Sequence, residues 1–149
     1  MGLMTKGELA ENLFRSGLNC SQAVAVSFCE ETGLDENLVK KLTHGFGGGM
    51  GRLREVCGAM SGTVFVLSAI YGNEEKAKLY ERIQTVASEF KLQNGSLVCR
   101  ELLNLNIKGA DSPTPEKRTE LYYKKRPCPK IIASSADILE KYIKSHPIS

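Results

Sequence analysis

Four of the five cysteines in this chain lie just before, or within, the first turn of an expected helix: Cys20, Cys57, Cys99 and Cys128. The N-terminus of a helix carries partial positive charge and N–H groups that have no partner within the helix. Both features favour a thiolate over a thiol, and the thiolate is the form of cysteine that attacks electrophiles and binds metals. The fourfold repetition therefore predicts one site where several helix ends meet around sulfur.

Helical patterns occupy most of the sequence, and no pair of strands is evident. Caps and apolar residues at helical spacing predict helices over residues 5–15, 19–33, 35–42, 57–71, 74–92 and 96–103, and from residue 129 onward, and they leave a further short helix open over 116–124. The β-branched residues within 63–66 leave a strand as an alternative at that point. We expect an all-α fold, with residues 1–149 forming one compact domain built as a bundle of about six or seven helices.

Composition and charge exclude several functional classes. No apolar run approaches the ~20 residues that span a bilayer, and the charged start of the chain shows no signal peptide, so we expect a cytoplasmic protein without a membrane partner. The net charge of +3 is too small to indicate nucleic-acid binding. The basic segment 117–130 is interrupted by acidic Glu120 and is expected to be a solvated face. Disulfides are rare in the cytosol and five cysteines is an odd number, so the cysteines indicate metal binding or redox catalysis.

The spacing of the four cysteines leaves three kinds of site open. They match no local zinc motif such as C-x-x-C, and no C-x-x-C-H is present, so covalent haem is not expected. Four thiolates assembled from separate helices could hold an iron–sulfur cluster or another metal ion. Two of them could instead cycle between dithiol and disulfide, or all could be small buried apolar residues. Cys29, late in its expected helix, is predicted to be a core residue apart from this site.

A glycine-rich run at residues 45–51 separates two of the expected helices. It cannot form a helix interior, because glycine costs about 1 kcal/mol per residue there. It could cradle an anion with its N–H groups, pack closely against the cysteine site or a cofactor, or serve as a flexible connector. Gly58 and Gly62 lie on one face of the helix 57–71 and would let another backbone approach closely. The glycines expected to lie against a cofactor are Gly47, Gly48, Gly49 and Gly58.

Five segments of the chain, taken in order, resemble the motifs of the C-GCAxxG-C-C family of putative redox-active proteins. These segments are residues 19–24 (NCSQAV), 45–51 (GFGGGMG), 57–62 (CGAMSG) and 99–103 (CRELL), then Cys128 with the helix that follows it. The resemblance covers most of the chain. It implies a redox or metal site at Cys20, Cys57, Cys99 and Cys128, with the glycine run beside it. A related segment accompanies haem domains in split-Soret cytochromes, but this chain lacks their haem-attachment motif.

From the sequence we expect a redox protein whose four cysteines hold an iron–sulfur or other metal centre and exchange electrons with a redox partner protein. One alternative is a metal-free thiol–disulfide protein in which the same four cysteines are the catalytic residues. Cys57 would be one member of the reactive pair there, because it follows the glycine run and opens the most apolar helix. Another alternative is a non-catalytic interaction module with packed cysteines. Each of these could function as a homodimer.

Overall fold

The computed structural model describes residues 4–148, and the regular structure in this range is helical. The elements are α1 (Lys6–Arg15), α2 (Cys20–Val26), α3 (Cys29–Thr32), α4 (Glu36–Thr43), the 3-10 turn η1 (His44–Phe46), α5 (Gly47–Met50), α6 (Gly58–Tyr71), α7 (Lys76–Asn94), α8 (Cys99–Leu102), α9 (Glu120–Lys125) and α10 (Cys128–Ser145). The predicted all-α class is confirmed. None of the described helices combines the length and apolar character that a membrane span requires.

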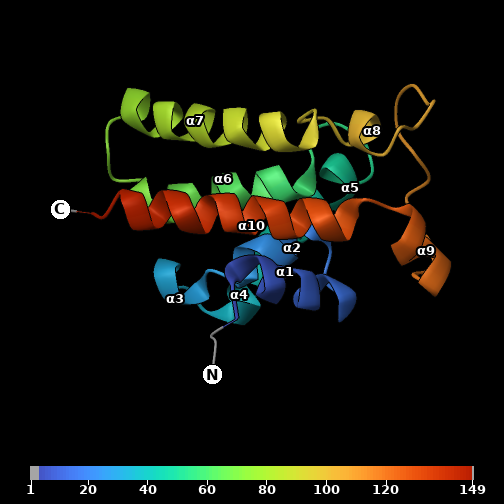
Figure 1. Ribbon diagram of the computed structural model, residues 1–149, viewed down its shortest axis with the longest axis horizontal. Helices are drawn as coiled ribbons and strands as arrows, with labels where there is room; N and C mark the ends of the chain where they lie inside the picture. The colour runs from blue at the N-terminus through green and yellow to red at the C-terminus, as the bar shows by residue number, and fades with distance from the viewer. Residues whose placement is uncertain (1–3, 149) are drawn as a thin grey trace.

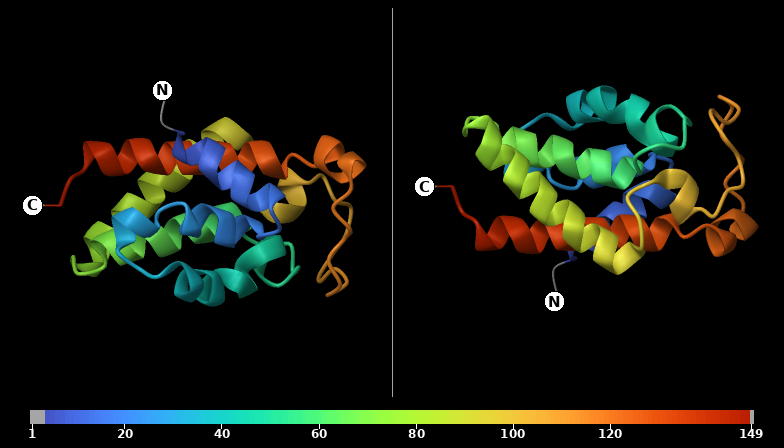
Figure 2. Two further views of the ribbon diagram at one scale, coloured as in Figure 1. Left: turned by 90° about the horizontal axis from the view of Figure 1, so that it is seen from below. Right: turned by 90° about the horizontal axis from the view of Figure 1, so that it is seen from above.

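Three long helices, α6, α7 and α10, lie side by side along the long axis of the molecule (Figure 1). α1 packs on α10, and α2 packs between α4 and α6. The short elements α5, α8 and α9 gather at one end together with the loop 103–119, and the C-terminus lies at the opposite end (Figure 2). The N-terminal ends of α6 and α10 both point to the end where the short elements gather. This arrangement brings several helix starts close together.

Local sequence signals set the starts of two N-terminal helices. The Thr5 hydroxyl accepts a hydrogen bond from the backbone N–H of Glu8, and the Thr5 backbone N–H donates to the Glu8 carboxylate in return, which makes the capping box that begins α1. Asn19 and Gln22 form the same reciprocal pair at the start of α2, with both bonds at 3.0 Å. The second box fixes Cys20 as the first residue of α2.

The close approach predicted for the glycines of helix α6 is confirmed, and the backbone that approaches is that of α2. A Cβ added at Gly62 would lie 2.7 Å from the carbonyl oxygen of Ser21, and one added at Gly58 would overlap the sulfur of Cys20. The two glycines therefore let α2 and α6 pack backbone to backbone. The largest fully buried side chains come from several elements: Phe28 follows α2, Leu67 lies in α6, Phe90 in α7, and Ile132 and Leu139 in α10.

The helix expected over 19–33 is broken in the middle. The hydroxyl of Ser27 donates to the carbonyl of Val24 at 2.6 Å, and Phe28 leaves the helical conformation as its ring enters the core. α3 then starts at Cys29. The placement of Cys29 late in a helix is therefore wrong, since all five cysteines lie at helix starts. This break, together with the short turns η1 and α5, gives more helices than the six or seven expected.

Other boundaries also differ from those expected. Residues 63–66 lie within helix α6, so the strand alternative is wrong. Ser96 does not cap α8, because its hydroxyl accepts from the backbone of Val98, the residue that precedes the helix. The helix expected over 116–124 begins later, at Glu120, where Thr119 supplies the cap.

Candidate cysteine site

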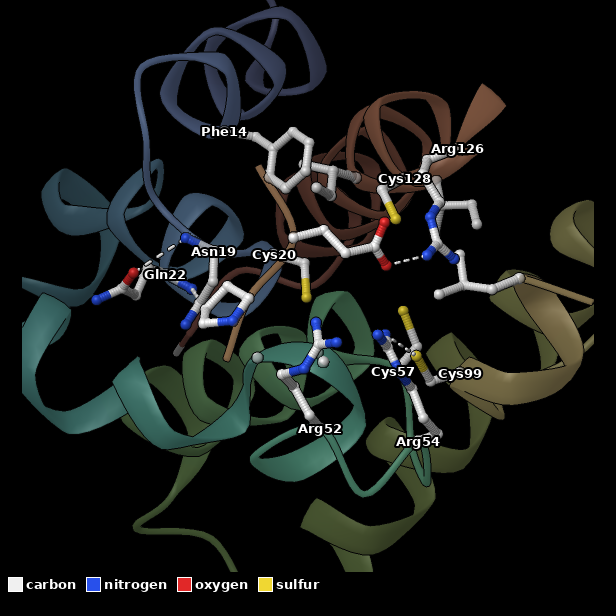
Figure 3. A pocket seen from close by; sticks show the side chains of 18 of the residues that line it. Phe14, Asn19, Cys20, Gln22, Arg52, Arg54, Cys57, Cys99, Arg126 and Cys128 are labelled. Atoms are coloured by element: carbon white, nitrogen blue, oxygen red, sulfur yellow. Dashed lines mark hydrogen bonds and ion pairs between the residues drawn. The ribbon is translucent and has the colours of Figure 1, made fainter. Parts of the chain in front are cut away.

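All four cysteines that the sequence singles out line one cavity at the end of the molecule where the short elements gather (Figure 3). Cys20, Cys99 and Cys128 are the first residues of α2, α8 and α10, and Cys57 immediately precedes α6. The cavity has a volume of about 590 Å³. Cys29 does not line it. The structure thus brings together four helix starts that are far apart in the sequence.

Burial dominates the ionisation of these thiols. Removal from water raises the pKa of Cys20, raises that of Cys57 well above its usual range, and raises that of Cys128 to about 12. Negative charge on Cys99 would raise all three further. Neighbouring thiolates therefore disfavour the ionisation of Cys20, Cys57 and Cys128 as long as no cation lies among them.

Backbone groups at the helix starts act in the opposite direction but are outweighed. Hydrogen bonding by the backbone of Gly48 lowers the pKa of Cys20, and the backbone of Ala59 and Met60 lowers that of Cys57. In both cases the loss of water is the larger effect. The expectation that helix starts favour thiolates is therefore wrong in sign at Cys20, Cys57 and Cys128 for the protein without a bound cation.

Cys99 differs from the other three cysteines because a cation lies at its sulfur. Nη1 of Arg54 donates to Sγ of Cys99 over 3.6 Å, and the Arg54 side chain is only 5% exposed. Nε and Nη2 of the same guanidinium donate to one carboxylate oxygen of Asp111 at 3.2 and 3.0 Å. A buried arginine is tolerable here because Asp111 balances its charge.

The glycine run turns the chain sharply around Cys99. Beyond the glycines themselves, Met50, Arg52 and Arg54 have left-handed backbones, with φ of 68°, 64° and 61°. Such a conformation costs a non-glycine residue about 1–2 kcal/mol, and strain of this kind concentrates at functional sites. A Cβ at Gly49 would lie 2.7 Å from both the Cβ of Cys99 and the Cα of Arg54. Of the three roles considered for the run, close packing beside the cysteines is the one that these contacts support.

The glycines expected to contact a cofactor divide into two groups. Gly47, Gly48 and Gly58 line the cavity, whereas Gly49 lies behind Cys99 and does not. Gly58 lines the cavity at the start of α6, directly against the Cys20 sulfur. Three of the four glycines are therefore placed where a group held by the cysteines would meet them.

The loop 103–119 forms one wall of the cavity and is tied to its surroundings by arginines. Arg118 donates to the carbonyl oxygens of Phe14 and Leu18, and its guanidinium lies 4.0 Å from the centre of the Phe14 ring. Glu116 forms an ion pair with Arg126, which is visible in Figure 3.

The sequence did not predict these loop contacts or the Arg54–Asp111 pair. The only signal was the position of Arg52 and Arg54 directly after the glycine run.

The cysteines have the chemistry of a metal centre, but they are not gathered tightly enough around one point to hold a single metal ion. Four thiolates are the ligand set of iron–sulfur clusters, and all five cysteines are free thiols. Within residues 4–148, however, no three His, Cys, Asp or Glu side chains lie close enough together to hold a metal ion. The sulfurs surround a cavity rather than one metal-sized point.

The comparisons with known proteins agree with the motif pattern. The model of the C_GCAxxG_C_C family, described as putative redox-active protein, matches residues 18–142. The chain belongs to this family. The matched range includes the four cysteines of the cavity, the glycine run and Arg54. No curated protein and no solved structure matches the chain.

Proposed function

We propose that this protein carries out redox chemistry with Cys20, Cys57, Cys99 and Cys128 acting as one site that holds an iron–sulfur or other metal centre. The observation that carries the proposal is that four free thiols from four separate helix starts line one cavity. Thiolate sulfur is the ligand of iron–sulfur clusters. Zinc accepts the same ligands but has no redox chemistry, so a redox role favours iron.

The charges that line the cavity support a metal centre that is negative overall. Metal binding requires that thiols lose their protons, and here burial and mutual repulsion oppose that loss until positive charge is supplied. Four arginines line the cavity, whereas Glu116 is the one carboxylate among its described lining residues, and Asp111 pairs with two of the arginines from outside the lining. This excess of positive charge suits a centre that four thiolates make negative. In this proposal the electrons are exchanged with a redox partner protein.

A metal-free thiol–disulfide couple is the second candidate, favoured by the contact between Arg54 and the sulfur of Cys99. In that chemistry two thiols give two electrons and two protons to an oxidant such as glutathione disulfide. A disulfide forms in the protein, and the S–S bond of the oxidant becomes two thiols. Because burial raises the pKa of Cys57, the cation at Cys99 makes Cys99 better suited than Cys57 to attack the oxidant.

Anaerobic purification followed by iron, zinc and acid-labile sulfide analysis distinguishes these candidates. Iron and sulfide that are retained in Cys29→Ala but lost in Cys57→Ala support the metal centre, because Cys29 lies outside the cavity. Metal-free protein with a reversible two-electron couple supports the thiol–disulfide candidate. Metal-free protein without a couple, in which each cysteine-to-alanine change costs only a small packing penalty, identifies an interaction module with packed cysteines.

A further inference from the structure

Arg54 is a buried arginine whose guanidinium contacts two different groups. Nη1 of the guanidinium contacts Sγ of Cys99 in the cysteine site at 3.6 Å. Nε and Nη2 bond to the carboxylate of Asp111. Figure 3 shows the Arg54 side chain beside the sulfurs of Cys57 and Cys99. The guanidinium thus connects the loop 103–119, which carries Asp111, to the cysteines.

The backbones that carry Arg54 and Cys99 are fixed to each other. The N–H of Cys99 donates to the carbonyl of Glu55 at 2.6 Å, and the N–H of Arg100 donates to that of Arg54 at 3.2 Å. The N–H of Arg54 in turn donates to the carbonyl of Gly48 in the glycine run at 3.2 Å. The contact between guanidinium and sulfur is therefore set by the backbone on both sides and does not depend on a freely mobile side chain.

Asp111 is also fixed by hydrogen bonds to its side chain and its backbone. Its second carboxylate oxygen accepts from the N–H of Ser112 at 2.8 Å, and its own N–H donates to the carbonyl of Arg52 at 3.0 Å. Arg52 also approaches the carboxylate, at 3.3 Å. Hydrogen bonding from Ser112, followed by that from Arg54, keeps the pKa of Asp111 below its usual range. The carboxylate thus stays charged and can hold Arg54 against the sulfur.

We propose that Arg54 is a positioning residue that stabilises negative charge on the Cys99 sulfur, and that Asp111 couples the loop 103–119 to the redox potential by holding Arg54 in place. This inference rests on the proposed redox function. Reduction increases the negative charge that sulfur carries, whether the electrons enter a metal centre or break a disulfide. A fixed positive charge at Cys99 therefore stabilises the reduced state and raises the reduction potential.

The test is the midpoint potential of the purified protein in four variants. Arg54→Met removes the charge, Arg54→Lys keeps it, and Asp111→Asn removes the group that holds it. Arg100→Met is the matched control, because Arg100 belongs to the same cluster but bonds carbonyl oxygens and Glu55 rather than sulfur. Potentials are measured by protein-film voltammetry. The metal-free protein is also equilibrated in glutathione redox buffers, which requires no bound centre.

We expect Arg54→Met to shift the redox equilibrium at least tenfold towards the oxidised state, which is about 59 mV for a one-electron couple and about 30 mV for a two-electron couple. Asp111→Asn should shift it in the same direction by less, because release of Arg54 from the Cys99 sulfur outweighs the loss of one neighbouring negative charge. Arg54→Lys should recover most of the loss. Arg100→Met should match the unmodified protein. If Arg54→Met does not fold, Asp111→Asn and Arg54→Lys decide the question.

The two ways of failing are distinguishable. A couple whose potential is unchanged in Arg54→Met and Asp111→Asn, or shifted equally in Arg100→Met, overturns the role of Arg54 and leaves the redox function standing. Absence of any redox couple in the unmodified protein, in both measurements, overturns the role of Arg54 and the proposed function together.

Discussion

The thiol of Cys128, a half-buried residue at the start of α10, should make the protein less stable in alkali. Burial raises the pKa of Cys128 to about 12, whereas the pKa of a cysteine in an unfolded chain is about 8.5. The unfolded chain therefore loses this proton first as the pH rises. The stability that comes from keeping the thiol neutral is fully present below the unfolded pKa and is lost as the pH approaches the folded pKa.

Each pH unit between the two pKa values lowers the free energy of unfolding by about 1.4 kcal/mol for one such proton. Between pH 8.5 and 10.5 the contribution of Cys128 should therefore fall by about 2 kcal/mol or slightly more. The measurement is urea unfolding of reduced, metal-free protein at several pH values, for the unmodified chain and for Cys128→Ala. Subtracting the two removes the lysine and tyrosine titrations that both proteins share.

The stability advantage of the unmodified protein over Cys128→Ala should shrink steadily across this pH range. A difference that stays constant within about 0.5 kcal/mol, well inside the change expected from linkage, would refute the reasoning. It would mean that the Cys128 thiol is solvated in the folded protein, and that burial does not oppose the ionisation of the cavity cysteines.

Two further predictions test the packing around the cavity. Gly58→Ala should destabilise the protein by about 1–3 kcal/mol in chemical unfolding, because the added Cβ would overlap the Cys20 sulfur. The matched control is Gly45→Ala, whose added Cβ meets no atom within 4 Å, and equal destabilisation by the two changes would contradict this account. Arg118→Met should increase the rate at which a protease cuts the loop 103–119, because the Arg118 guanidinium hydrogen-bonds two carbonyl oxygens at the end of α1. An unchanged cleavage rate would show that the other contacts of the loop hold it in place.

Much of the fold could be predicted because its signals are local. The capping box of Asn19 and Gln22 is readable as a four-residue pattern, and it places Cys20 at the first position of α2. The break at Ser27 and Phe28 was not predictable from such patterns. It depends on a side-chain hydrogen bond and on the burial of a ring against residues distant in the sequence.

The site could be predicted in its location but not in its electrostatics. The helix-start positions and the motif order singled out the four cysteines that line the cavity. The direction of their pKa shifts depends on how much water the surrounding elements remove, which appears only after packing. The same holds for Asp111, which lies 57 positions from Arg54 and carries no sequence signal that links the two.

The central claim is that the four cavity cysteines form one redox site, and anaerobic voltammetry of single-cysteine variants tests it most directly. The account predicts a reversible couple in the unmodified protein and in Cys29→Ala, whose altered cysteine lies outside the cavity. It predicts loss of that couple, or a large change in its potential, in Cys20→Ala, Cys57→Ala, Cys99→Ala and Cys128→Ala. A protein without a reversible couple, or a couple that survives all four changes unaltered, would contradict it.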